Sequence, residues 1–242
     1  MTHWTASWRS AWTARWRSAW KTPGLVQNFL WNRLLYLPGI AGNYASTPDS
    51  AAVSITGDID IRIRLALNPW IKPTPQVLIQ KNGGASQLSW LFYVFSFGTR
   101  PAFEWTVDGT TQLDLASSEV LVFADGSAQW LRVTLDVDNG AVGHDAKFYT
   151  SENGLNWSQL GTTQTGVGVT SIFDSSADLE ITGTIFLPTS KIYYAEVRNG
   201  IDGPVVAKFD PNKTTPGATS FVSSTGETWT INQSGSPKAE IQ

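Results

Sequence analysis

The residue types that most often carry out catalysis are scarce in this sequence. It has no cysteine and only two histidines, His3 and His144. His3 lies in a tryptophan repeat and His144 in a predicted loop, so a Ser-His-Asp triad or a histidine metal site lacks its parts. The 20 acidic residues could supply a glycosidase pair. However, no Glu-x-Asp-x-x-Glu strand occurs, and the acids alternate outward or occupy turns. We therefore expect no catalytic residue and no enzyme activity.

One acidic stretch resembles half of a calcium-binding loop. Asp136, Asp138 and Asn139 are followed by Gly140, as in an EF-hand, but the glutamate that completes such a loop is missing. A tight hairpin turn explains Asp138, Asn139 and Gly140 without an ion. We expect the turn, with calcium held by Asp136, Asp138 and Asn139 as the alternative, and no other cofactor.

The large aromatic residues offer another kind of chemistry, stacking against sugar rings. Four tryptophans fall among the predicted strands and loops, and each one taken alone is expected to pack in a core or a hairpin: Trp70, Trp90, Trp105 and Trp157. Trp70 lies in the proline-rich loop 68–75, where we expect it to be exposed. It is therefore the candidate for a glycan contact.

The segment from Thr150 to Trp157 resembles the Asp-box hairpin of sialidases, with Glu152 where aspartate is usual. In those proteins the hairpin is a structural turn away from the active site. The resemblance thus implies an extracellular type of β-protein and does not imply hydrolysis.

A tryptophan recurs at every fourth position near the N-terminus. An α-helix would gather these indoles in a band about 160° wide, whereas a strand would also place them on one face; we favour the helix. Five indoles exceed what a monomer usually leaves exposed, so we expect residues 1–24 to be an assembly segment that docks on a partner or a second copy. Packing on the chain's own domain and binding to a membrane surface are the alternatives. The five residues are Trp4, Trp8, Trp12, Trp16 and Trp20.

The rest of the chain reads as short strands. Asp58–Leu67 alternates strictly, which predicts a strand with isoleucines and leucines inside and with Asp58, Asp60, Arg62 and Arg64 facing water. About a dozen such strands, joined by Asn-Gly and Asp-Gly turns, predict an all-β fold, an antiparallel β-sandwich of jelly-roll type. We expect a linker over 25–33, the jelly roll over 34–235 and a polar tail over 236–242.

Charge and hydropathy limit the classes of partner that we expect for this chain. The net charge is −3, and no cluster of lysine and arginine follows the N-terminal repeat, which argues against nucleic acid. No run of about 18 apolar residues occurs, so we expect neither a membrane span nor a signal peptide.

Several separated blocks resemble minor tail proteins of siphophages that infect actinobacteria, whose body is similar to the laminin G-like, concanavalin A-like jelly roll. The blocks are YLPGIAGNYASTPDSAAVSITGDIDIRIRLAL, WLRVTLDVDNGAVGHDAKFYTSENGLNWSQLG, IFDSSADLEI and YYAEVRNGIDGPVVAKFD. The resemblance implies a non-enzymatic component of the phage tail, located in the virion. Its partners would be other tail proteins, a second copy of the chain and host cell-wall glycan. The alternatives are a free lectin-like module and, last, a glycosidase of the same fold.

Overall fold

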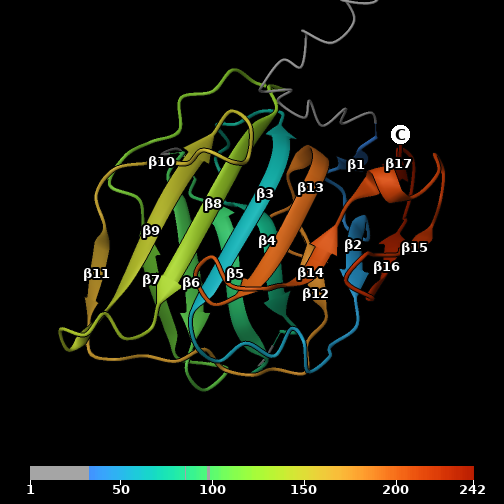
Figure 1. The fold of residues 1–242 in the computed structure, drawn as a ribbon. Coiled ribbons are helices and arrows are strands. Elements are labelled where there is room, and N and C mark those ends of the chain that lie inside the picture. Colours follow the sequence, from blue (N-terminus) through green and yellow to red (C-terminus); the bar gives the residue numbers. More distant parts are fainter. Residues whose placement is uncertain (1–32, 85, 97–98) are drawn as a thin grey trace, which may run out of the picture. The chain divides into compact units, whose positions relative to one another are not determined.

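Two antiparallel sheets stacked face to face make up the fold. The computed structural model describes residues 33–84, 86–96 and 99–242, and Figure 1 shows one sheet in front of the other. The tryptophan repeat, the predicted segment 1–24 and the linker up to residue 32 lie outside the described residues. Within the described part, the only helix is the single 3-10 turn Pro211–Lys213. No helix of that part is long and apolar enough to cross a membrane.

Sheet A has β3 near its centre. Its strands follow the order β10-β9-β8-β3-β13-β1-β17, with β11 paired to β9 and β14 to β13. Their bounds are β1 Leu35–Pro38, β3 Ile59–Leu67, β8 Gln129–Asp136, β9 Gly143–Ser151, β10 Ser158–Gln159, β11 Gln164–Val167, β13 Thr189–Asn199, β14 Val205–Phe209 and β17 Glu240–Ile241.

Sheet B follows the order β15-β16-β2-β12-β4-β5-β6-β7. Its strands are β2 Tyr44–Thr47, β4 Gln76–Asn82, β5 Leu88–Val94, β6 Pro101–Thr106, β7 Gln112–Ala116, β12 Leu179–Ile181, β15 Ser220–Val222 and β16 Thr228–Asn232. The predicted antiparallel sandwich is therefore confirmed.

The core lies between the sheets and follows the period-two pattern of the strands. Ile61 and Ile63 of β3 are fully buried, next to Val133 and Leu131 of β8 in the antiparallel register. From sheet B, Phe103 stacks between Trp90 and Trp105, with centroid distances of 6.1 and 6.0 Å. Because apolar burial is the main stabilising contribution, this alternation fixes which face of each strand points inward.

The outward face of β3 differs from the prediction. Asp60 is fully buried, not exposed to water. Its two carboxylate oxygens accept hydrogen bonds from Arg132 at 2.9 and 2.8 Å, and Arg62 also binds it, at 3.2 and 2.7 Å. The backbone N–H of Asp202 donates a further hydrogen bond at 3.1 Å. The period-two pattern gives the face correctly but cannot show that neighbouring long side chains and a loop cover it.

The C-terminal residues correct a second prediction. Residues 236–242 are not a polar tail, because Ile241 and Ala239 are fully buried and β17 pairs with β1. The backbones of Leu34 and Gln242 exchange hydrogen bonds at 3.0 and 2.8 Å, so the sandwich extends to Gln242. Residues 184–186 form a loop, since Thr182, Gly183 and Phe186 all have positive φ, a backbone conformation that strands do not use.

Candidate functional site

Trp70, the residue nominated for a glycan contact, lies inside the protein. Its side chain is 1% exposed, and its indole Nε1 donates to the carbonyl of Ser127 at 3.4 Å. The backbone N–H of Trp70 donates to the Asp125 carboxylate at 2.8 Å. The expectation of an exposed Trp70 is therefore wrong, because the loop 121–128 folds over the proline-rich loop and covers the indole.

Trp70 instead supports another aromatic ring. The ring of Phe123 meets it edge to face, with centroids 5.1 Å apart and an interplanar angle of 63°. The hydrogen bond from Gly126 N to Leu67 O, at 2.8 Å, also ties the loop that carries Phe123 to the end of β3. Phe123 thus has a fixed position at the surface, and its loop gave no pattern by which the sequence could have identified it.

Opposite Phe123 stands the hairpin that resembles an Asp-box, residues 150–157. The Ser151 hydroxyl accepts hydrogen bonds from the backbone N–H groups of Asn153 and Gly154 and donates to Asn156 O. The Asn153 side-chain oxygen accepts from the N–H groups of Leu155 and Asn156, each at 2.9 Å. These internal bonds satisfy the turn, so Glu152 is not needed to hold it together.

Packing on the outer face of sheet A holds the same hairpin in place. A Cβ at Gly154 would lie 2.7 Å from the Trp130 ring, and Gly154 has a φ of +73°, so the backbone rests directly on that indole. Trp157 meets Trp130 edge to face. The Trp157 ring also covers the guanidinium groups of Arg62 and Arg132 at 5.7 and 5.8 Å, a favourable cation–π distance.

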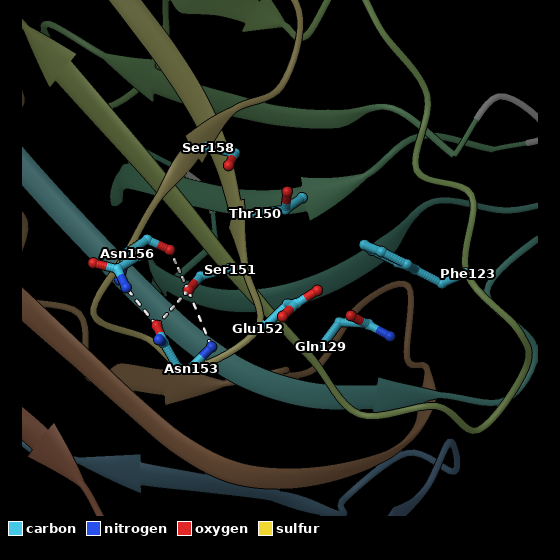
Figure 2. Close-up of a pocket in the computed structure, with 8 residues that line it drawn as sticks. All are labelled: Phe123, Gln129, Thr150, Ser151, Glu152, Asn153, Asn156 and Ser158. Carbon is cyan, nitrogen blue, oxygen red and sulfur yellow. Dashed lines mark hydrogen bonds between the residues drawn. The ribbon is translucent and has the colours of Figure 1, made fainter. Parts of the chain in front are cut away.

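Between the hairpin and Phe123 lies a pocket of about 430 Å³, which we call the hairpin pocket. Figure 2 shows Glu152 and Gln129 lying between the hairpin and the Phe123 ring. Among the lining side chains, those of Thr150, Glu152, Asn156 and Ser158 have no hydrogen bond to any described residue. The full lining is Phe123, Gln129, Thr150, Ser151, Glu152, Asn153, Asn156 and Ser158.

The chemistry of this lining is that of recognition. An aromatic face binds apolar C–H surfaces, and carboxylate, amide and hydroxyl groups together accept and donate hydrogen bonds. Glu152 is the one carboxylate of the lining, whereas glycoside hydrolysis uses two that flank the scissile bond. The sequence singled out Glu152 through the hairpin resemblance but gave no sign of Phe123 or Gln129.

The candidate calcium ligands form a turn. Asp138 and Asn139 accept hydrogen bonds from the backbone N–H groups two residues on, at 3.1 and 2.9 Å, and Asp136 accepts from Asp138 N at 3.2 Å. The Asn139 amide also donates to Asp145, and this hydrogen bond lowers the pKa of the Asp145 carboxyl. The hairpin turn is confirmed. The described ranges contain no group of three or more metal-binding side chains.

No known protein family matches this sequence, and no curated protein matches it. Solved structures with a similar fold include the heptameric SAP-like pentraxin of Limulus polyphemus, at 8% identity and a TM-score of 0.48, over 69% of this chain and 76% of that one. The Ruminococcus gnavus sialidase CBM40 bound to alpha2,3 sialyllactose is 14% identical, with a TM-score of 0.44, over 67% and 90%.

The binding domain of botulinum neurotoxin serotype G is 13% identical, with a TM-score of 0.45, over 64% of this chain and 36% of that one. Each TM-score is below 0.5, so these likenesses carry no argument about ligand or activity.

Proposed function

We propose that this protein is a non-catalytic, lectin-like module that binds carbohydrate in the hairpin pocket. The observation that carries the proposal is the combination, around one pocket, of the fixed Phe123 ring with polar side chains that have no partner in the described chain. A sugar ring has an apolar face for the aromatic ring and hydroxyl groups for Glu152 and the amide side chains. The volume of about 430 Å³ is within the range of small-ligand sites.

A glycan array probed with the full chain would identify the ligand, and calorimetry would then measure its affinity. Phe123→Ala removes the stacking ring, and we expect about a fivefold loss of affinity, because an aromatic contact contributes about 1 kcal/mol. Val122→Ala is the matched control, since Val122 is the preceding residue and is 85% exposed. Equal affinity of the two variants, or an array without a hit, would contradict the proposal.

The blocks that resemble siphophage minor tail proteins support a narrower proposal. In it the chain is part of a phage tail, residues 1–24 dock on another tail protein or a second copy, and the hairpin pocket faces host cell-wall glycan. We expect light scattering to show an oligomer that becomes a monomer when residues 1–21 are deleted. Unchanged mass, together with unchanged incorporation of the truncated chain into tails, would refute this assembly role and leave carbohydrate binding to be tested separately.

A further inference from the structure

A second pocket lies on the outer face of sheet B, away from the core. Its volume is about 310 Å³, and most of its lining is apolar or aromatic. Tyr93 and Leu91 of β5 point into it, while their neighbours on the strand, Phe92 and Trp90, belong to the core. We call it the aromatic pocket, and the lining side chains that matter here are Leu88, Leu91, Tyr93, Phe95, Glu104 and Phe186.

Three aromatic rings surround this pocket from two directions. Tyr93 and Phe95 meet edge to face with centroids 5.0 Å apart. Phe186 comes from the loop that follows β12, is 49% exposed, and its carbonyl accepts a hydrogen bond from Val77 N at 3.1 Å. The loop therefore places an exposed ring beside the sheet, so that a ligand here would contact both the sheet and the loop.

Glu104 is the exceptional polar group of the lining. In the described ranges it is the one carboxylate that is not exposed and yet has neither a hydrogen bond nor an ion pair. Asp114 lies directly opposite it on β7 and adds a second negative charge, which is unfavourable for a cross-strand pair. Burial, and then Asp114, raise the pKa of the Glu104 carboxyl.

The other buried acids of the two sheets are compensated. Glu180, on the same face of sheet B, accepts a hydrogen bond from Gln80 at 2.7 Å, and Glu196 of sheet A accepts one from Arg198 at 2.7 Å. A cationic ligand would give Glu104 the hydrogen-bond donor that Glu180 and Glu196 already have within the chain. The aromatic rings attract a cation as well, through the negative potential of their faces.

We infer that the aromatic pocket binds a small organic ammonium ion carried on an apolar body. Such a ligand places its charge at Glu104 and its apolar part against Leu88, Leu91 and the aromatic rings. An anion would be repelled by Glu104 and Asp114, and a neutral apolar ligand would desolvate Glu104 further without compensating its charge. The site is separate from the hairpin pocket and goes beyond the proposed carbohydrate binding.

The test is an NMR titration of the full-length protein at pH 7 with benzylamine, and with benzyl alcohol as the neutral analogue of the same shape. We expect saturable shifts from benzylamine in residues 88–95 and 185–186, with an affinity at least about tenfold above that of benzyl alcohol. Added salt should weaken the binding of the amine and leave that of the alcohol unchanged.

Glu104→Gln keeps the shape of the side chain and removes its charge, so it should lower the affinity for benzylamine about fivefold. It also removes an uncompensated charge, so the variant is expected to fold. Glu119→Gln is the matched control, because Glu119 is exposed and does not line the pocket, and it should bind as the wild type does. Equal binding of amine and alcohol, unchanged binding by Glu104→Gln, or shifts confined to the hairpin pocket would overturn the inference.

Discussion

The outer faces of the two sheets differ in whether a carboxylate at the face has a partner in the chain. On sheet A, Asp60 is fully buried between Arg62 and Arg132, and Trp157 covers both guanidinium groups. On sheet B, Glu104 is half-buried beside the apolar lining of the aromatic pocket and forms no ion pair within the part of the chain that the structure describes. On the first face Asp60 is compensated by two arginines, whereas on the second Glu104 has neither a hydrogen bond nor an ion pair within the described residues.

This difference separates a structural role from a ligand-binding role. A buried carboxylate with several charge-assisted hydrogen bonds stabilises the fold only as long as its partners remain. A partly buried carboxylate without a partner in the chain costs stability, and a bound ligand is one explanation for its presence. We call the outer face of sheet A, with Asp60 between its arginines, the paired face, and the outer face of sheet B, with Glu104, the unpaired face. The paired face holds the hairpin that lines the hairpin pocket, and the unpaired face is open to a ligand.

The largest change in stability should come from a substitution on the paired face. Asp60→Asn removes the fully buried carboxylate that pairs with both Arg62 and Arg132, and we expect it to lower the free energy of unfolding by about 3 kcal/mol. Urea denaturation measures this change. Asp174→Asn is the control, because Asp174 is exposed, and it should change stability by less than about 0.5 kcal/mol. If the two variants were equally stable, the charge cluster would not hold sheet A together.

The next effect tests whether the hairpin depends on the paired face. Gly154→Ala should cost about 2 kcal/mol and weaken saccharide binding, because its Cβ would lie 2.7 Å from Trp130. Gly140 has the same φ of +73° but no atom within 4 Å of an added Cβ. Gly140→Ala therefore reports backbone strain alone, about 1 kcal/mol. If Gly154→Ala and Gly140→Ala lost the same stability and the same affinity, contact with Trp130 would not position the hairpin.

A smaller effect concerns acid stability. Burial alone would raise the pKa of Asp202, but the charges and hydrogen bonds of Arg132 and Arg62 outweigh it, and the pKa is lowered. The resulting stabilisation is present above the unfolded pKa, about 3.9, and is lost as the pH falls through the lower folded value. Thermal unfolding should thus show wild type above Asp202→Asn at pH 7, with the gap closing below about pH 4. A gap that stays constant in acid would contradict this.

The smallest effect has the opposite sign and belongs to the unpaired face. Because the folded pKa of Glu104 is raised, the native state binds more protons than the unfolded state above about pH 4.3, and stability falls as the pH rises through the folded value. After allowance for solvent screening, Glu104→Gln should be about 0.5 kcal/mol more stable than wild type at pH 7. Urea denaturation at pH 7 and pH 3.5 should show that gain vanish in acid; a loss of stability at pH 7 would mean that Glu104 is compensated.

The sequence predicted the sandwich well because alternation along β3 and the Asn-Gly and Asp-Gly turns are local signals. It predicted the burial of polar residues poorly. Whether Asp60 meets water depends on Arg132, which is 72 residues away, and on a loop that closes over it. The alternation of Ala239 and Ile241 was too short to identify β17.

The candidate site was predicted only in part. The hairpin and Glu152 were recognisable from their local pattern, and Trp70 was recognised as an aromatic residue of interest. The ring that lines the pocket is Phe123, which Trp70 supports from behind. No spacing within the sequence relates the two, because the contact arises from the packing of two irregular loops.

The most direct test of the central claim is NMR chemical-shift mapping of a bound saccharide on the full chain. The hairpin pocket predicts that the shifts gather in two stretches distant in sequence, residues 121–129 and 150–158, and that Phe123→Ala raises the saccharide concentration needed to reach them about fivefold. Shifts that gather over the outer face of sheet B, or the absence of any saturable shift with a saccharide that the array identifies, would contradict the assignment of carbohydrate binding to this pocket.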